Sequence, residues 1–75
     1  MKKFMEKFIE RFIERLKELR AQKGLSQAQL AKATGLSQSA ITYWETGKRI
    51  PNAYAVIILA RFFDVSTDYL LGEED

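Results

Sequence analysis

The side chains in this 75-residue chain that could do chemistry are hydrogen-bonding and basic groups. The sequence contains no Cys and no His, which excludes disulfides, zinc sites built on those residues, and Ser-His-Asp or Cys-His catalytic centres. One short stretch gathers polar and basic side chains: Gln38, Ser39, Thr42, Tyr43, Lys48 and Arg49. Amides and hydroxyls both donate and accept hydrogen bonds, and the catalytic centres named above are excluded. We therefore predict a binding surface and not an enzyme.

Positive charge is concentrated in the front two-thirds of the chain. Residues 1–24 hold eight Lys or Arg against four Glu, residues 25–52 hold three against one, and residues 53–75 hold one against five acidic residues. The modest net charge of +2 therefore combines a basic front with an acidic tail. We expect a polyanion to bind to the front part.

Glycines and helix-capping residues divide the chain into helices. The four glycines stand where the apolar periodicity stops, and a Ser or Asn stands where it starts, as at Ser26 with Gln29 three residues later. We predict helices over residues 3–23, 26–33, 37–45, 53–63 and 66–71. Their apolar positions describe one core: Leu16, Leu19, Leu30, Ala31, Leu36, Ile41, Trp44, Val56, Ile57, Leu59, Ala60, Phe63, Val65, Tyr69 and Leu70. Trp44 is in helical register with Ile41, which favours a place in this core over one against a ligand.

The stretch from Gln27 to Glu45, QAQLAKATGLSQSAITYWE, has the spacing of two short helices that cross at a tight turn. The crossing needs a small residue, here Ala31, and the turn needs a residue that accepts left-handed backbone angles, here Gly35. Apolar residues then lock the second helix across the first: Leu30, Leu36, Ile41 and Trp44. This pattern predicts a helix-turn-helix.

The segment from about Phe12 to Gly72 resembles the DNA-binding domain of phage repressors and Cro proteins, the XRE family. Three stretches outside the turn carry the resemblance: RLKELRAQKGLSQ before it, WETGKRIPN after it, and FFDVSTDYLLG at the end. The resemblance implies an all-α fold, a compact five-helix bundle of the lambda-repressor-like DNA-binding type with an extended N-terminal first helix. We divide the chain into an amphipathic extension of that helix (residues 1–11), a helix-turn-helix domain (12–72) and an acidic tail (73–75).

In this family the second helix of the motif enters the major groove and the first lies across the DNA backbone. The resemblance therefore assigns base reading to the exposed side chains of the second helix: Gln38, Ser39, Thr42 and Tyr43. Gln suits a bidentate contact with adenine, and Thr suits a thymine methyl group. For Tyr43 a second interpretation stays open, in which its ring only covers the edge of the core.

The resemblance assigns contacts with the DNA backbone to residues that flank the recognition helix. Gln27 matches a family position that contacts a phosphate and braces the first residue of the recognition helix. Lys48, Arg49 and Asn52 lie in the loop with which the family grips the sugar-phosphate backbone. Such contacts set affinity and register, not sequence preference. The alternative is that these are ordinary solvent-exposed polar side chains.

The family pattern also places an Arg of the first helix against the Glu that ends the recognition helix, here Arg20 and Glu45. We predict a structural ion pair that orients the recognition helix and whose disruption is costly if it is buried. The alternative is two unpaired surface charges.

The N-terminal helix carries more apolar surface than a domain of this size can cover, at Phe4, Met5, Phe8 and Ile9. Contiguous exposed apolar surface usually marks an interface. We favour self-association through this helix, which would give a homodimer able to read an inverted-repeat operator with half-sites about 34 Å apart. Two alternatives stay open: packing against the chain's own Phe62 and Phe63, and an amphipathic helix at a membrane surface.

The sequence as a whole predicts sequence-specific binding of double-stranded DNA and regulation of transcription. We favour a repressor, because a small domain acts most simply by occupying its site. We expect no cofactor, no metal and no small-molecule ligand. A cytoplasmic location is expected, since the chain shows neither a signal-peptide pattern nor an apolar run long enough to cross a bilayer. The other classes are a protein-interaction module that has lost DNA binding and a membrane-associated protein.

Overall fold

Five helices follow one another along the chain, joined by short turns. They are α1 (Lys2–Gln22), α2 (Gln27–Thr34), α3 (Gln38–Glu45), α4 (Ala53–Phe63) and α5 (Thr67–Leu70). The structure is a computed structural model that describes residues 2–74, with side chains from Glu6 onward. The predicted all-α, five-helix fold is confirmed, and each helix end lies within one residue of its predicted position. In this described part of the chain, no helix is long and apolar enough to cross a membrane.

Side-chain caps begin four of the helices where the sequence predicts them. The capping residues Ser26, Ser37, Asn52 and Ser66 each accept a hydrogen bond from the backbone amide three residues later. At α2 the Gln29 side chain also accepts from the backbone amide of Ser26 at 2.8 Å, which completes a capping box. The same helix ends at Gly35, whose φ of 77° carries no steric cost for glycine. This turn brings α3 back across α2.

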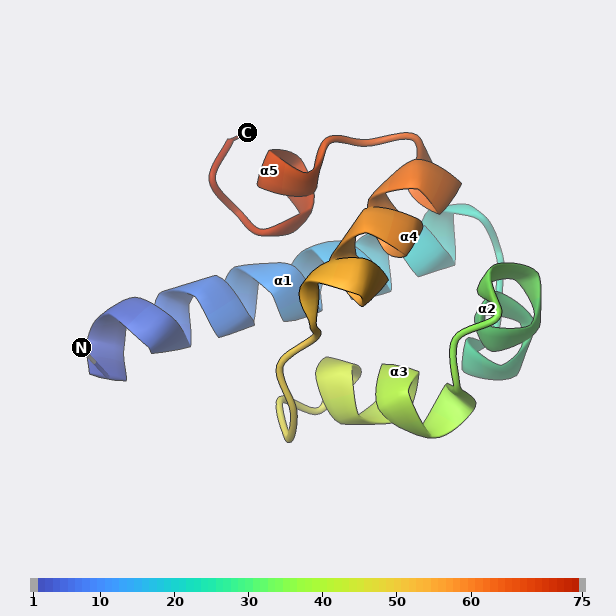
Figure 1. The fold of residues 1–75 in the computed structure, drawn as a ribbon, viewed down its shortest axis with the longest axis horizontal. Coiled ribbons are helices and arrows are strands. Elements are labelled where there is room, and N and C mark those ends of the chain that lie inside the picture. The colour runs from blue at the N-terminus through green and yellow to red at the C-terminus, as the bar shows by residue number, and fades with distance from the viewer. Residues whose placement is uncertain (1, 75) are drawn as a thin grey trace.

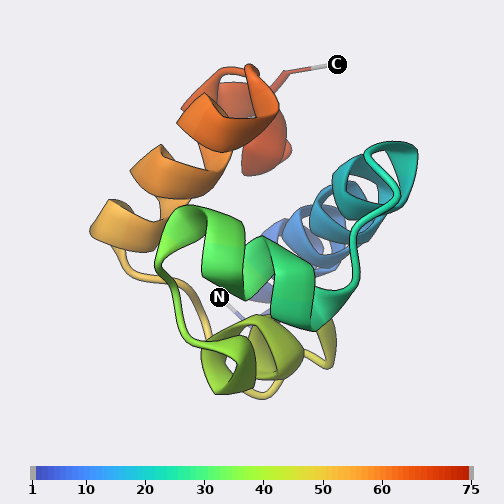
Figure 2. The same ribbon diagram turned by 90° about the vertical axis from the view of Figure 1, so that its right-hand side faces the viewer.

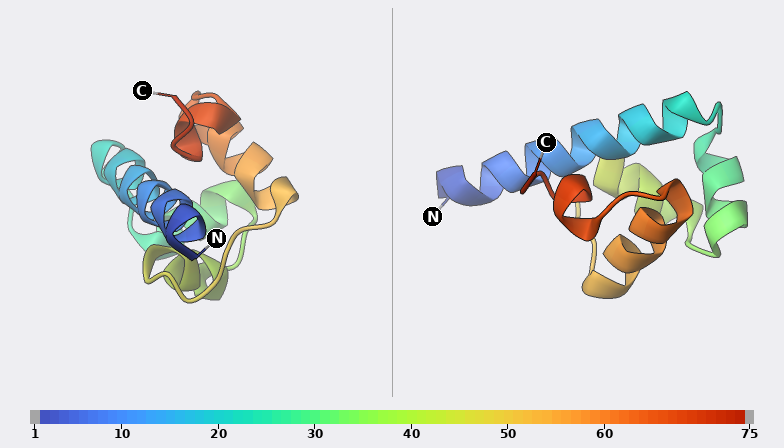
Figure 3. Two further views of the ribbon diagram at one scale, coloured as in Figure 1. Left: turned by 90° about the vertical axis from the view of Figure 1, so that its left-hand side faces the viewer. Right: turned by 90° about the horizontal axis from the view of Figure 1, so that it is seen from above.

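The long helix α1 supports the rest of the fold. It contacts α3 on one side and α5 on the other, while α4 and α5 lie together (Figure 1). Figure 2 looks onto α2, which lies across α3 and α4. The N-terminal end of α1 projects past the other helices, as Figure 3 shows from above. The molecule therefore has a long axis of 35 Å against 24 and 21 Å in the other directions.

Every helix contributes one fully buried aliphatic side chain to a single core: Leu16, Leu30, Ile41, Leu59 and Leu70. Trp44 is 6% exposed and lies in this core, as predicted. Ile57 does not, because 45% of its surface is exposed. The buried face of α4 is formed by Ala55, Val56, Leu59, Ala60 and Phe63, and this helical spacing turns position 57 outward. The placement of Ile57 in the core was therefore wrong.

One ion pair holds the end of the recognition helix against α1. Arg20 donates through Nε to Glu45 Oε2 at 2.7 Å and through a terminal nitrogen to Oε1 at 2.9 Å. Arg20 also donates to the backbone oxygen of Leu25 at 2.8 Å. The Glu45 side chain is 4% exposed and that of Arg20 is 21% exposed. The pair is thus bidentate and largely removed from solvent, which makes it sensitive to the loss of either partner.

The surroundings of Glu45 favour its charged form. Burial by itself raises the pKa of the carboxyl group, but hydrogen bonds from Arg20 and Gln27 and the charges of Arg20 and Lys17 outweigh it, so the pKa is lowered. A group whose pKa is lower in the folded state stabilises the fold above its ordinary pKa, here 4.5. That contribution is lost as the pH falls through the folded-state pKa.

We expect Glu45→Gln to lower the free energy of unfolding by about 2 to 4 kcal/mol at neutral pH, because Arg20 then loses its counter-charge while part of it stays buried. The difference from the wild type should shrink as the pH falls below the ordinary carboxyl pKa of 4.5. Urea unfolding followed by Trp44 fluorescence measures both effects. The control is Glu18→Gln on the exposed side of α1, which should change little at any pH. A Glu45→Gln deficit that stays constant from pH 7 to pH 3 would contradict the charge argument.

Candidate nucleic-acid interface

The four side chains predicted to read bases lie together on the outer face of α3. Gln38, Ser39, Thr42 and Tyr43 line one open hollow, as residues one helical turn apart share a face. Gln38 and Ser39 are exposed, Tyr43 is 36% exposed and Thr42 is half-buried. The opposite face of α3 is buried in the core. The helix is thus anchored on one side and presents amide and hydroxyl groups on the other.

Tyr43 connects this face to the basic loop that follows it. The guanidinium carbon of Arg49 lies 5.0 Å from the centroid of the Tyr43 ring, a cation–π contact. The backbone amides of Lys48 and Arg49 donate to the backbone oxygen of Tyr43 at 2.8 and 3.4 Å. The Tyr43 ring therefore contacts the loop, and the residue also lines the hollow; both sequence interpretations stay open.

The loop between α3 and α4 presents donors next to the recognition face. Lys48 and Arg49 are exposed there. Asn52 at the end of the loop accepts a hydrogen bond from the Ala55 backbone amide at 2.8 Å through Oδ1. Its oxygen is thus used to cap α4, and its NH₂ group is the part that can donate to a phosphate.

The surface formed by residues 25–52 exposes positive charge alone. Glu45 is the only acidic residue in this range, and it is buried against Arg20. Lys32, Lys48 and Arg49 are all exposed. Within this range, phosphates would meet exposed basic side chains and no exposed carboxylate. Across residues 2–74 no group of three His, Cys, Asp or Glu side chains is arranged to hold a metal ion.

Gln27, at the start of α2, is bound to the recognition helix by both ends of its amide group. Its Nε2 donates to Glu45 Oε1 at 3.0 Å, and its Oε1 accepts from Thr42 Oγ1 at 2.6 Å. The sequence predicted that it braces Gln38, but its hydrogen bonds go one to two turns further along α3. The link to Thr42 was missed because it depends on how α2 crosses α3, which no local pattern reveals.

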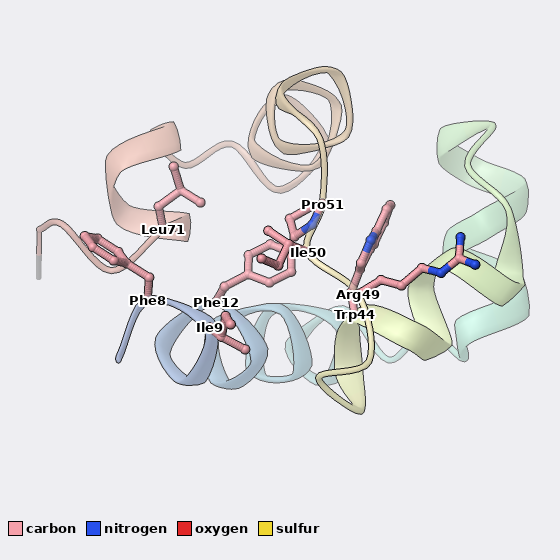
Figure 4. Close-up of a pocket in the computed structure, with 8 residues that line it drawn as sticks. All are labelled: Phe8, Ile9, Phe12, Trp44, Arg49, Ile50, Pro51 and Leu71. Atoms are coloured by element: carbon pink, nitrogen blue, oxygen red, sulfur yellow. The ribbon is translucent and has the colours of Figure 1, made fainter. Parts of the chain in front are cut away.

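The N-terminal extension packs on the chain itself in part. Phe8 and Ile9 are half-buried and line a hollow with Phe12, Trp44, Arg49, Ile50, Pro51 and Leu71. Figure 4 shows Phe8 and Leu71 at one end of this hollow and Trp44 and Arg49 at the other. Phe4 and Met5, also predicted to take part in self-association, have side chains outside the described part of the structure.

Packing on Phe62 and Phe63 was the alternative considered for this extension, and the structure gives those rings other neighbours. Phe63 is buried in the core, and Phe62 stacks edge-to-face on it with ring centroids 5.1 Å apart. The ammonium group of Lys23, beyond the other end of α1, lies 5.3 Å from the Phe62 centroid. The hollow beside Phe8 is instead closed by the loop before α4 and by the segment after α5.

Two arginines of α1 hold the C-terminal segment in place. Arg11 donates to the backbone oxygen of Gly72 at 2.7 Å, and Arg15 donates to those of Tyr69 and Glu74. The Arg15 guanidinium also lies 4.1 Å from the Tyr69 ring centroid. A Cβ atom at Gly72 would come within 2.5 Å of the Arg11 side chain, so only glycine allows this close approach. The segment from Tyr69 to Glu74 is therefore tied to α1.

Comparison with known proteins agrees with this geometry. The model of a helix-turn-helix family, HTH_3, matches residues 16–70. The HTH-type transcriptional activator BcrR of Enterococcus faecalis is 42% identical over 60 residues, which cover 80% of this chain and 29% of that protein. The uncharacterized HTH-type transcriptional regulator YobD of Bacillus subtilis is 38% identical over 60 residues and 54% of its length. The chain thus spans about half or less of these two relatives.

Solved structures show the same fold. The restriction-modification controller protein C.AhdI from Aeromonas hydrophila superposes with a TM-score of 0.75 at 37% identity, over 83% of this chain and 94% of that one. The SOS-response transcriptional repressor LexA from Eubacterium rectale gives a TM-score of 0.80 at 30% identity, over 92% of this chain and 71% of that one. The predicted lambda-repressor-like architecture is therefore confirmed.

Family membership follows from these matches, since the family model covers more than half of the chain and C.AhdI is matched over almost its whole length. It agrees with the prediction that the chain is a binding module and not an enzyme. The protein belongs to the helix-turn-helix family of DNA-binding domains, of the repressor and Cro type that its motif between Gln27 and Glu45 indicated.

Proposed function

We propose that the protein binds double-stranded DNA at specific sequences by placing α3 in the major groove, and that it regulates transcription as a repressor. The observation that carries this proposal is the outer face of α3, where four hydrogen-bonding side chains line one open hollow. The exposed charges of the surrounding residues 25–52 are all basic. Direct readout needs the first feature and affinity for phosphates needs the second.

The proposal divides the site into two sets of residues. Gln38, Ser39, Thr42 and Tyr43 read bases. Gln27, Lys48, Arg49 and Asn52 contact the sugar-phosphate backbone. We assign DNA binding to residues 12–72 and divide the rest of the sequence into an N-terminal extension (1–11) and an acidic tail (73–75). Relatives come from bacteria and from the archaeon Archaeoglobus fulgidus, which have no nucleus, so we place the activity in the cytoplasm.

The first test is selection from a random duplex library by the purified protein at about 150 mM salt. We expect an enriched sequence, because hydrogen bonds from α3 distinguish base pairs in the major groove. Sequencing of the bound fraction measures the enrichment. Binding without enrichment that disappears as salt rises would leave only charge attraction. That outcome would favour the protein-interaction class.

Repression is tested separately from DNA binding, because one relative is named an activator and one structural neighbour a repressor. We expect that a selected site placed over a promoter makes expression fall when the protein is supplied, as bound protein excludes polymerase. A reporter with the site moved upstream is the control and should respond little. Increased expression from the upstream site would replace the repressor with an activator and leave the DNA-binding proposal intact.

The two sets of residues predict different responses to substitution. Gln38→Ala should weaken binding to the best site by about 1 to 3 kcal/mol and relax the preference at one or two base pairs. Lys48→Ala should weaken binding to every sequence and reduce the slope of log affinity against log salt by about one. Titrations of specific and random duplexes at several salt concentrations separate the two. Equal effects of both substitutions on both duplexes would contradict the division.

We further propose that the protein binds an inverted-repeat operator as a homodimer through its N-terminal extension. The hollow beside Phe8 and Ile9 measures about 80 Å³, which suits one apolar side chain better than a ligand, since ligand pockets start at about 300 Å³. Ile50, at its rim, is 60% exposed. Apolar surface on a projecting helix is favourably covered by a second copy.

We expect the wild type to sediment as a dimer at tens of micromolar and Ile9→Lys to shift towards the monomer, because the substitution puts a charge into the apolar surface. Sedimentation equilibrium with and without a two-half-site duplex makes the measurement. The matched control is Ile57→Lys on α4, an isoleucine that is 45% exposed. If Ile57→Lys alone produces monomer, the interface lies on α4. A wild type that is monomeric with and without DNA would rule out the dimer.

A further inference from the structure

Four side chains from three helices form one continuous chain of hydrogen bonds that ends on the recognition face. Arg20 of α1 donates twice to Glu45, at 2.7 and 2.9 Å. Gln27 of α2 donates to the same carboxylate at 3.0 Å, and Thr42 donates to Gln27 at 2.6 Å. The charged pair is buried or nearly so, while Thr42 lines the hollow with the base-reading side chains.

The direction of every hydrogen bond in this chain is determined by the first one. An ionised carboxylate can only accept hydrogen bonds, so the NH₂ group of Gln27 must face Glu45. The carbonyl oxygen of Gln27 then faces Thr42 and can only accept. The Thr42 hydroxyl must therefore donate its single proton to Gln27.

This leaves Thr42 without a proton to offer to a base. In a helix a threonine hydroxyl commonly bonds the backbone oxygen one turn earlier, but here it turns towards α2 instead. Because a β-branched side chain has few χ1 states in a helix, this bond also holds the Cγ2 methyl group in one position. Thr42 can then offer a base its methyl group or a hydroxyl oxygen that accepts, and of these only the methyl group suits thymine, which shows an acceptor and a methyl group in the major groove.

We propose that Thr42 is a specificity-determining residue that recognises the 5-methyl group of a thymine, and that Gln27 is a positioning residue that holds the Thr42 methyl group towards the DNA. The inference rests on the proposed function, in which α3 lies in the major groove, where the thymine methyl group is exposed. Arg20 and Glu45 act on Thr42 only indirectly, because they orient the Gln27 amide.

The experiment replaces each thymine of the selected half-site in turn by deoxyuridine, which lacks only the methyl group. At one position wild-type affinity should fall about fourfold, the effect of exposing one methyl group that was buried. Thr42→Ser keeps the hydroxyl but lacks the methyl group and should bind the two duplexes equally, whereas Thr42→Val keeps the methyl group, replaces the hydroxyl by a second one and should retain the discrimination. Thr67→Ser in α5 is the control for the same chemical change and should behave like the wild type.

The role of Gln27 is tested by the ratio of the affinities for the thymine and deoxyuridine duplexes, which a purely structural role of Gln27 would leave unchanged. Gln27→Met frees the Thr42 hydroxyl to bond elsewhere, so the discrimination between thymine and deoxyuridine should fall below about twofold. In the double variant Gln27→Met/Thr42→Val, residue 42 has no hydroxyl group that could form another hydrogen bond and turn the side chain. This variant should recover the discrimination. Fluorescence anisotropy titrations of both duplexes give the ratios, and thermal unfolding confirms that each variant is folded.

The outcomes separate this inference from the function on which it rests. Enrichment of a binding site with no deoxyuridine penalty at any thymine would overturn the role of Thr42 and leave sequence-specific binding intact. A preference lost in Thr42→Val and kept in Thr42→Ser would overturn the role of the Thr42 methyl group, because serine lacks it and valine keeps it. Discrimination in Gln27→Met equal to that of the wild type would remove Gln27 as a positioning residue. Failure of the selection itself counts against the proposed function.

Discussion

Glu45 brings a negative charge into the protein with only 4% of its side chain exposed, and the placement of the recognition helix depends on how that charge is compensated. An eight-residue helix such as α3 is not stable alone in water. Ile41 and Trp44 bury one of its faces, but apolar contacts tolerate some sliding and rotation. The bidentate pair with Arg20 does not, because its hydrogen bonds require a defined geometry. α1 therefore determines where α3 ends and how it is turned.

The same helix carries a second restraint near its middle. Arg11 and Arg15 bind backbone oxygens of the last turn of α5 and of the segment after it, as cations commonly do at carbonyl groups that a helix end leaves unpaired. Gly72 lets that segment lie against the Arg11 side chain. α1 thus ties the C-terminal part of the chain and the recognition helix to one rigid element. Both contacts are made from this one helix.

The sequence predicted helix ends well and contacts between helices less well, for a physical reason. Caps such as Ser26 with Gln29 are local, so a few neighbouring residues determine them. Ile57 was misplaced because α4 is apolar almost throughout, and a run such as Ala55 to Ala60 shows no polar gap from which to read the buried face. The partners of Gln27 and of Phe8 depend on crossing angles and on the path of a loop. Neither is encoded in the spacing of residues along one helix.

The size of the recognition face limits how much DNA sequence one copy of the chain can distinguish. From Gln38 to Tyr43 the helix rises about 7 Å, which corresponds to about two base-pair steps along the duplex. With about 1 to 3 kcal/mol for each good contact, two contacts discriminate between sites by a factor of about 30 to about 3 × 10⁴. A genome offers about 10⁶ or more competing sites. Selective occupation of one site by this fold therefore requires more than one copy of α3 on the same DNA, or contacts from outside the helix.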